Sequence, residues 1–310
     1  MNLIEKLAKD LKLGNSYIES IVNRADYYYR DYTIPKKNGG QRNIAQPSPE
    51  LKTLQYWVLK NILLRLPVSK YAVAYKKGDS VKNNALLHTK SSYFLHIDIK
   101  DFFNSIRFSH LEGILRENRN VFDDLHIDIN DALNEIAKIC FRRNRLSIGA
   151  VSSPAISNII MFSFDVDISV YCRQHGFTYT RYADDIYISS EKYINNEVLV
   201  FVEQKLLGKQ LFLNRKKTRF CSKKYKIKIT GLIIGTDQNI YWGTERKKQL
   251  KKMLYDKLVH GRGDSNRLLG WLAFLRNVEP IFYSKLLIKY SKYCKDDIID
   301  FLKNNSIIKQ

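Results

Sequence analysis

The sequence has few cysteines and no long apolar run. Four of its 310 residues are cysteine, and none stands in a Cys-x-x-Cys pair or beside paired histidines. That spacing argues against a zinc site and favours reduced, mostly buried thiols. No apolar run approaches the roughly 20 residues that a membrane span needs, and residues 1–10 predict an amphipathic helix rather than a signal peptide. We therefore expect a cytoplasmic protein with no membrane partner.

Acidic residues are scarce beside basic ones. Lys and Arg number 52 against 31 Asp and Glu, a formal net charge of +21. A generic basic protein is one interpretation, but a surplus this large favours salt-sensitive binding to a polyanion, nucleic acid above all. The 45% apolar content, without repeats or low-complexity linkers, predicts a folded chain of two or three subdomains.

Two adjacent carboxylates lie at the centre of the stretch from Tyr179 to Ser189. Strand-forming residues flank Tyr182-Ala-Asp-Asp185 on both sides, which predicts a β-hairpin whose tight turn carries Asp184 and Asp185. Two acids at a hairpin tip repel each other, and a divalent cation would remove that penalty. An ordinary Asp-Asp turn is the alternative, because Asp tolerates turn dihedral angles.

A third carboxylate lies inside an apolar segment. Residues 93–99 predict a buried strand in which Asp98 is flanked by Ile97 and Ile99. A lone carboxylate there is costly unless it is paired or bound to a metal. A salt bridge to a nearby Lys or Arg is the alternative. The Asp-Asp pair in the same chain favours metal ligation.

A basic hairpin is predicted over residues 27–45. Its Lys36, Lys37 and Arg42 are either solvated charges or a clamp for a triphosphate. Arg42 suits that clamp best, because a guanidinium takes phosphate oxygens in a bidentate fork.

Two loops carry features for binding a nucleotide. After the Asp98 strand, backbone N–H groups around Asp101-Phe102-Phe103 could meet a phosphate while a ring packs on a sugar. Gly149 allows close backbone approach to a ligand, and Ser152-Ser153 would cap the helix expected at 155–172.

The remaining pattern is helical, apart from a strand expected over residues 226–234 with Thr230-Gly231 midway. Helices are expected within 1–30, 51–66, 108–145 and 197–207, and from 244 onward. Basic residues crowd 205–252, which points to a polymer-binding face. Candidates for contacting RNA in the C-terminal helices are Lys247, Lys248, Lys251 and Arg267.

The order of these blocks resembles a reverse transcriptase over nearly the whole chain. The blocks are Asp98 in a strand, Gly149-Ala-Val-Ser-Ser-Pro154, Tyr182-Ala-Asp-Asp185, the Lys-Thr block Asn214-Arg-Lys-Lys-Thr218, and a Thr-Gly strand. Asn84-Ala-Leu-Leu-His88 and Ile229-Thr-Gly231 are similar to two elements of the bacterial retron type, the second with Ile in place of Val.

One position departs from the family pattern. Ser147-Ile148 stands where the family usually has Pro-Gln before Gly. Ile148 cannot make the hydrogen bonds of that Gln, so nucleotide affinity or fidelity would differ.

The resemblance implies an α+β right-hand polymerase. The fingers would span residues 1–90. The palm, with an antiparallel sheet, would span 91–243 and include a returning fingers segment at about 107–147. A helical thumb would span 244–310. Asp98, Asp184 and Asp185 would hold two Mg²⁺ ions, one activating the attacking hydroxyl and the other stabilising the leaving pyrophosphate.

The same resemblance implies roles for the other candidates. Lys36 or Lys37 and Arg42 would contact the triphosphate, and Asp101 to Phe103 would line the nucleotide pocket. Phe103 under the sugar would exclude a 2′-hydroxyl, making dNTPs the substrates. Lys217 would donate a proton to pyrophosphate, and Thr230 and Gly231 would grip the primer. Asn84 and His88 would be either structural polar groups or RNA contacts.

The implied function is that of a retron. The enzyme would copy part of a cognate structured non-coding RNA from an internal guanosine 2′-hydroxyl, giving branched RNA-linked single-stranded DNA. A separate RNase H would remove copied RNA, and a separate effector protein would serve anti-phage defence. One alternative is another bacterial reverse transcriptase, of the intron or diversity-generating kind. The Asn84-to-His88 element and the lack of a maturase or endonuclease extension argue against it. The other is a catalytically silent RNA-binding scaffold, against which the three carboxylates argue.

Overall fold

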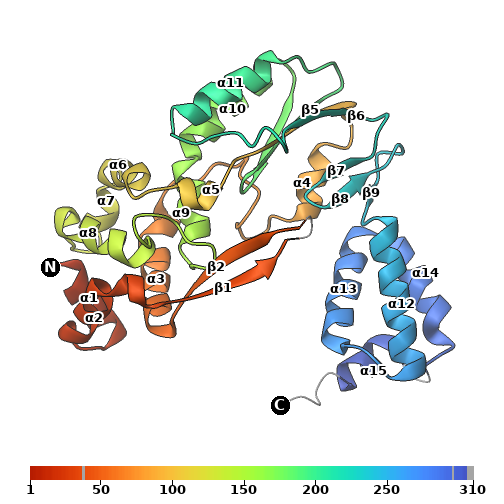
Figure 1. The fold of residues 1–310 in the computed structure, drawn as a ribbon, viewed down its shortest axis with the longest axis horizontal. Helices are drawn as coiled ribbons and strands as arrows, with labels where there is room; N and C mark the ends of the chain where they lie inside the picture. The colour runs from red at the N-terminus through yellow and green to blue at the C-terminus, as the bar shows by residue number, and fades with distance from the viewer. Residues whose placement is uncertain (37–38, 295–296, 306–310) are drawn as a thin grey trace. The chain divides into compact units, whose positions relative to one another are not determined.

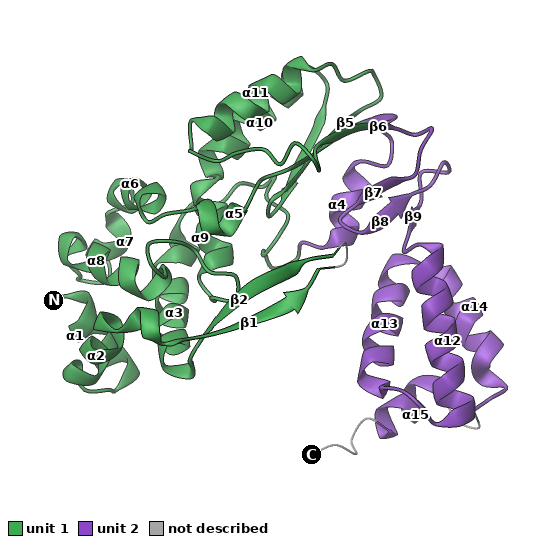
Figure 2. Cartoon of the chain, in the orientation of Figure 1, with its two compact units in different colours: residues 1–78, 94–220 green, residues 79–93, 221–310 purple. Residues whose placement is uncertain are grey.

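The computed structural model describes residues 1–36, 39–294 and 297–305. The chain divides into two compact units, the first of residues 1–78 and 94–220 and the second of 79–93 and 221–310 (Figure 2). Both combine helices with antiparallel strands, so the expected α+β class is confirmed. The division into fingers, palm and thumb follows other boundaries and stays a prediction.

The first unit begins with a helical cluster and a long hairpin. Helices α1 (Leu3–Leu11) and α2 (Asn15–Asn23) pack on α8 (Ile129–Cys140), as does α3 (Pro49–Asn61). The expected basic hairpin is present: β1 (Tyr29–Pro35) pairs antiparallel with β2 (Gln41–Pro47) (Figure 1). Short 3₁₀ turns at Ala25–Tyr27 and Leu63–Arg65 join these elements.

A four-stranded sheet forms the centre of the first unit. Its order is β4 (Thr178–Tyr182), β5 (Asp185–Ser190), β3 (Tyr93–Asp98) and β6 (Arg219–Ser222), the strand within which the unit ends. Helix α10 (Phe162–Gln174) packs on β4, and α11 (Glu197–Leu207) packs on α10. Strand β5 is almost wholly buried, which explains its continuous apolar run.

The helical stretches are more broken than periodicity predicted. Residues 108–145 contain α6 (Ser109–Glu117), α7 (Asn120–Asp123) and α8, after the short α5 (Phe102–Ser105). The helix expected at 155–172 is α9 (Ser153–Ile160) followed by α10, with a bend of 49°. The expected Ser cap is wrong: Ser152 is itself αR, and no side-chain capping bond forms at the start of α9.

Among the described residues, no single helix is both long and apolar enough to span a membrane, although α9 and α10 pass that test as a bent pair.

The second unit joins a small sheet to a helical bundle. Helix α4 (Val81–Leu87) packs on β7 (Ile227–Ile229), β8 (Leu232–Ile234) and β9 (Ile240–Tyr241). The bundle follows as α12 (Thr244–His260), α13 (Ser265–Val278), α14 (Pro280–Ser291) and α15 (Ile298–Asn304).

The single strand expected over residues 226–234 is wrong. Strands β7 and β8 form a hairpin, because Thr230 and Gly231 both have positive φ, 45° and 88°. Two successive positive φ values are the mark of a type I′ hairpin turn.

Candidate active site

The hairpin β4–β5 holds Asp184 and Asp185 as predicted. Tyr182 pairs with Asp185, which leaves Ala183 and Asp184 as the two turn residues. Ala183 has a φ of 58°, a left-handed conformation that costs an L-residue about 1–2 kcal/mol. Two bonds hold the turn: Arg181 Nη1 donates to the Ala183 carbonyl at 3.2 Å, and the Ile99 N–H donates to the Asp184 carbonyl at 3.0 Å.

A buried ion pair anchors this hairpin to α10. Arg181 and Asp165 are each 0% exposed and bond twice, Nε to Oδ1 at 2.8 Å and Nη2 to Oδ2 at 2.7 Å. Tyr179 donates its hydroxyl to the same carboxylate at 2.6 Å, and Arg181 also donates to Asn158 at 3.2 Å. Sequence reasoning missed this network. The available signal was an Arg within an apolar strand, which needs a carboxylate partner when buried.

Asp98 ends β3 beside the hairpin and is 5% exposed. The Asn214 N–H donates to its carbonyl at 2.8 Å, and Lys217 Nζ donates to its Oδ2 at 2.8 Å. The hydrogen bond to Asp98 raises the pKa of Lys217. The salt bridge named as the alternative to metal ligation is therefore present in this structure.

His96 contacts the catalytic candidates and was missed from the sequence. Its Nε2 lies 2.6 Å from Asp185 Oδ1, and its ring stacks on Tyr187 at 4.8 Å. His96 stands two residues before Asp98, so alternation along the strand places both side chains on one face of β3. That spacing was the signal available in the sequence.

The three carboxylates are close enough to interact electrostatically. Burial, then the charges of Asp185 and Asp98, raise the pKa of Asp184 to about 6, while Lys217 opposes the shift. A divalent cation would offset both the burial and the repulsion, and carboxylate oxygens are the ligands that Mg²⁺ takes in proteins. The donor set therefore fits Mg²⁺.

The carboxylates are not arranged as a preformed metal cage. Within the described part of the chain, no three His, Cys, Asp or Glu side chains are grouped so as to hold a metal ion. Asp98 is instead engaged by Lys217 and Asp185 by His96. A metal ion would compete with Lys217 and His96 for these two carboxylates.

Arg42, Phe103 and Phe102 were predicted to bind the nucleotide, and the structure shows where each of them lies. Tyr75 interacts electrostatically with both Arg42 and Asp184, which places Arg42 of β2 in the neighbourhood of the carboxylates. Phe103 is partly exposed and packs against Phe102 with ring centroids 5.6 Å apart. Phe102, in contrast, is 3% exposed, so only its backbone is left to line a nucleotide pocket, and that role stays a prediction. It is the inward residue of the first turn of α5.

For three other residues predicted to bind the nucleotide, the structure gives at most a position. Asp101 is exposed, with a φ of 46° at the start of α5, and Lys36 is exposed after β1. Lys37 lies outside the described residues.

The protein backbone alone requires a glycine at position 149. Its φ is 116°, and an added Cβ would lie 2.9 Å from the carbonyl oxygen of Ala45. The Ala45 N–H donates to the Ile148 carbonyl at 2.9 Å, so the loop is bonded to β2. Close approach to β2 is thus one reason for this glycine, and close approach to a ligand stays a prediction.

The retron-like elements lie in the second unit. Asn84 and His88 are both 0% exposed, and burial lowers the pKa of His88 to about 3. This burial favours their structural interpretation over RNA contact. In the β7–β8 turn, Thr230 Oγ1 donates to the Val81 carbonyl at 3.2 Å, and an Arg246 guanidinium donates to the Gly231 carbonyl at 3.4 Å.

The basic residues of the helical bundle differ in how strongly other side chains of the bundle hold them. Lys247 pairs with buried Glu279 at 2.5 Å, and that carboxylate also accepts from the Trp242 N–H at 2.8 Å. Lys251 lies over the Phe282 ring, whereas the side chain of Lys248 is 72% exposed. Lys247 therefore stabilises the unit internally, whereas Lys248 is exposed and has only a long, exposed ion pair with Glu245 at 3.9 Å.

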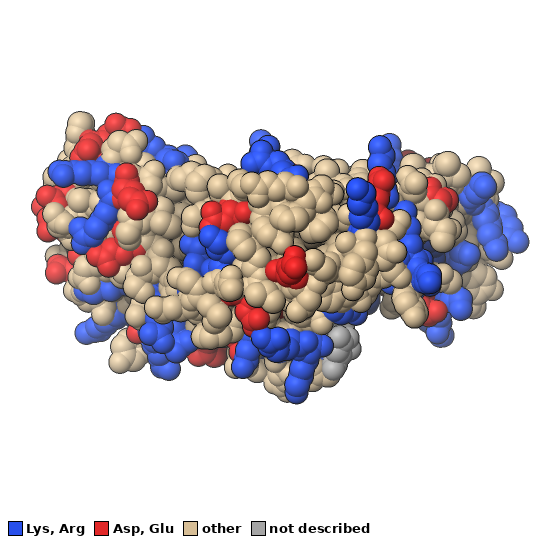
Figure 3. Space-filling model, turned by 90° about the horizontal axis from the view of Figure 1, so that it is seen from above, with Lys and Arg blue, Asp and Glu red and all other residues tan. Residues whose placement is uncertain are grey.

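Arg267 is exposed and lies over the Trp271 ring. Lys and Arg side chains are spread across the face drawn in Figure 3, with fewer acidic groups between them.

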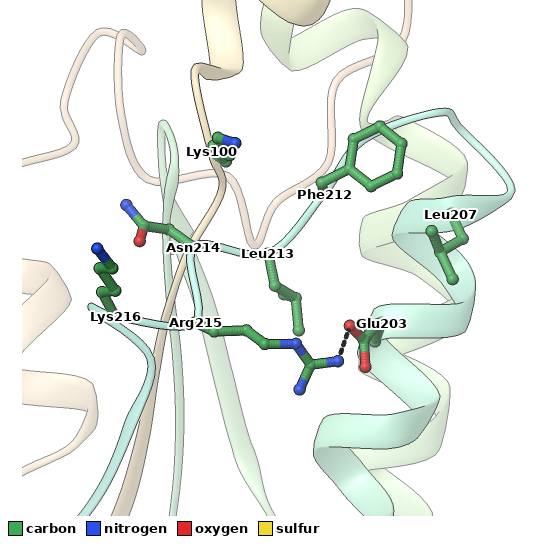
Figure 4. Close-up of a pocket in the computed structure, with 8 residues that line it drawn as sticks. All are labelled: Lys100, Glu203, Leu207, Phe212, Leu213, Asn214, Arg215 and Lys216. Atoms are coloured by element: carbon green, nitrogen blue, oxygen red, sulfur yellow. Dashed lines mark hydrogen bonds and ion pairs between the residues drawn. The ribbon is translucent and has the colours of Figure 1, made fainter.

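A cavity of about 440 Å³ lies beside the segment that supplies Lys217. None of the three carboxylates lines it. Arg215 bonds Glu203 across one wall (Figure 4). The lining residues are Lys100, Glu203, Leu207, Phe212, Leu213, Asn214, Arg215 and Lys216.

Carboxylates from β3 and from the tip of β4–β5 thus meet at one end of an antiparallel sheet backed by helices. This is the arrangement of a nucleic-acid polymerase. Residues 34–234 match the family model described as "Reverse transcriptase (RNA-dependent DNA polymerase)".

Three curated relatives from Escherichia coli carry the comparison further. The chain is 30% identical to the Retron Ec86 reverse transcriptase, with 94% of this chain and 89% of the relative covered. It is 32% identical to the Retron Ec83 enzyme (87% and 89%) and 33% identical to the Retron Ec73 enzyme (86% and 88%). The chain therefore belongs to the reverse transcriptase family, and it is of the retron type: an RNA-directed DNA polymerase.

Proposed function

We propose that the protein copies part of a cognate structured non-coding RNA, priming from an internal guanosine 2′-hydroxyl to give branched RNA-linked single-stranded DNA. The observation that carries the proposal is the meeting of Asp98, Asp184 and Asp185 in a chain of the retron type. An Asp-Asp turn alone would not support it. The bond from the Ile99 N–H to the Asp184 carbonyl at 3.0 Å, which ties the turn to the segment directly after Asp98, supports a shared site rather than an ordinary turn.

Asp98, Asp184 and Asp185 would hold two Mg²⁺ ions once Lys217 and His96 release them. When bound, the ions supply positive charge that lowers the pKa of the attacking hydroxyl and offsets charge on the leaving pyrophosphate. Lys217 carries a proton at neutral pH, and its hydrogen bond to Asp98 raises its pKa further above the ordinary value. Its Nζ would give a proton to the departing pyrophosphate.

Arg42, with Lys36 and Lys37 of the hairpin turn, would bind the triphosphate. Phe103 would pack under the sugar and reject a 2′-hydroxyl, which makes dNTPs the substrates. Thr230 and Gly231 would meet the primer end.

The exposed Lys248 and Arg267, with Lys251, would bind RNA phosphates. Lys247 contributes less, because its ammonium is held by Glu279.

The proposal includes partners and a compartment. A host RNase H would remove the copied RNA, and a separate effector protein would act with the product in anti-phage defence. All four cysteines are free thiols, which supports a reducing cytoplasm.

The test is to express the chain with the DNA that flanks its gene and to examine total nucleic acid. The wild type is compared with Asp184→Ala/Asp185→Ala. The matched control is Asp123→Ala/Asp124→Ala, a second Asp-Asp pair whose side chains are 61% and 59% exposed. RNA-linked single-stranded DNA should appear with the wild type and the control, and should be absent from the active-site variant.

If the wild type gives no such product, purified protein is assayed on a generic RNA template with primer, dNTPs and Mg²⁺. Synthesis there would refute 2′ priming and indicate another class of reverse transcriptase. Binding of RNA without synthesis would support the silent scaffold. Phage plating on strains carrying the same variants tests the defence role.

A further inference from the structure

Tyr75 has an unusual backbone for a large side chain. Its φ is 64°, in the left-handed region, and the residue is 53% exposed. A bulky residue with positive φ is a genuine outlier. Strained residues of this kind persist where the surrounding structure holds them, and they are concentrated at functional sites.

The ring of Tyr75 meets the residue expected to lie under the sugar. The Tyr75 and Phe103 centroids are 6.5 Å apart, with the planes at 66°. Phe103 also meets Phe102, with ring centroids 5.6 Å apart and planes at 65°. Edge-to-face contacts of this kind are favourable beyond simple burial. Phe103 is thus held by two rings, one buried in the core and one half-exposed.

The surroundings of Tyr75 place it at the site. Burial raises the pKa of its hydroxyl, and the charge of Asp184 adds to the shift while Arg42 opposes it. Tyr75 is therefore within electrostatic range of the carboxylate thought to bind metal and of the guanidinium thought to bind triphosphate. No feature of the sequence had marked it.

We propose that Tyr75 is a specificity-determining residue of the nucleotide pocket, holding the Phe103 ring where it excludes a ribose 2′-hydroxyl; this rests on the proposed function. Steric rejection of one hydroxyl needs a ring that cannot swing aside. Phe102 and Tyr75 both pack against Phe103 and restrict its movement.

Single-nucleotide incorporation on an RNA template tests this, with kcat/KM measured for each dNTP and its matching rNTP. Tyr75→Asn removes the ring, and Asn tolerates positive φ, so the fold is preserved. Tyr75→Gly is a second ring-free variant without a backbone penalty. Tyr75→Phe keeps the ring. The control is Tyr17→Asn, at a tyrosine of similar exposure (48%) on α2.

Both ring-free variants should lower the preference for dNTP over rNTP by about three- to tenfold, the range expected from losing one aromatic pair. Tyr75→Phe and Tyr17→Asn should leave the preference unchanged. An equal loss of dNTP and rNTP use in the ring-free variants would overturn the proposal, because a purely structural role predicts that result. An unchanged preference would also overturn it. A wild-type protein that incorporates nothing would instead refute the proposed function itself.

Discussion

The buried pair between Arg181 and Asp165 permits a quantitative test of how the catalytic hairpin is held. Asp165→Asn keeps the shape of the side chain but leaves the guanidinium of Arg181, which is 0% exposed, without a counter-charge. Removing one partner of a buried ion pair costs about 3–5 kcal/mol. In a unit of this size, 1 kcal/mol moves the melting temperature by about 2–4 °C, so the expected loss is about 6–20 °C.

The same helix supplies a matched control. Asp167 of α10 pairs with Lys205 at 2.7 Å, the distance at which Asp165 meets Arg181, but its two side chains are 44% and 39% exposed. Exposed pairs contribute about 0–1 kcal/mol. Asp167→Asn should therefore shift the melting temperature by no more than about 4 °C.

A double variant separates stability from activity. Arg181→Met/Asp165→Leu removes both charges, and apolar replacement of a buried pair is often neutral or stabilising. Its melting temperature should exceed that of Asp165→Asn. DNA synthesis by the double variant should be lower than by the wild type. The Ala183 carbonyl loses its Arg181 donor, so the turn that carries Asp184 is less restrained.

Thermal unfolding and primer extension on the four proteins decide the matter. If Asp165→Asn melts no lower than Asp167→Asn, burial of the pair does not have the energetic effect assigned to it. If the double variant synthesises DNA at the wild-type rate, Arg181 is not needed to position the turn.

Three further predictions follow from the site. Burial and neighbouring carboxylates raise the pKa of Asp184 from 3.8 to about 6. The protonated Asp184 carboxyl therefore contributes folding stability below pH 4 that is lost as the pH rises through 6. Asp184→Asn should match the wild type near pH 4 and exceed its stability by about 2–3 kcal/mol above pH 7, read from urea midpoints in EDTA; an equal gain at both pH values would contradict this. Lys217→Met frees Asp98, so the half-saturating Mg²⁺ concentration should fall while kcat drops by about 100-fold or more; an unchanged kcat removes the proton-donor role. Gly149→Ala forces a Cβ to within 2.9 Å of a β2 carbonyl oxygen and should lower the melting temperature, whereas Gly113→Ala, in α6 with open space around it, should raise it.

The parts of the site that the sequence could predict are those set by local pattern. Strand-forming residues on both sides of the Asp-Asp pair specify a hairpin, and its register places Asp184 in the turn without help from distant contacts. The strand ending in Asp98 is equally local, because its burial follows from its own composition.

The partners of these carboxylates depend on tertiary packing. Lys217 is far along the chain from Asp98, and a basic residue in a basic segment carries no signal of its partner. The inward direction of Phe102 and the outward direction of Phe103 are set by a helix of only one turn, too short to show periodicity.

Strained backbone explains why the single strand predicted over residues 226–234 was wrong. Thr230 is β-branched, so its own preference opposes the φ of 45° that converts an expected strand into the β7–β8 turn. Bonds from Thr230 to Val81 and from Arg246 to Gly231 override that preference.

Two residues near the carboxylates also have a φ that opposes their local backbone preference. Ala183 and Tyr75 both adopt positive φ where local preference would select glycine or asparagine. Ala183 is held by Arg181, and its turn places Asp184; Tyr75 contacts Phe103. A glycine at either position would relieve the strain but would also widen the range of conformations available to the turn or the loop. Strain at these two positions is therefore best explained by the need to fix Asp184 and Phe103, and it marks where local rules of sequence give way to the requirements of the site.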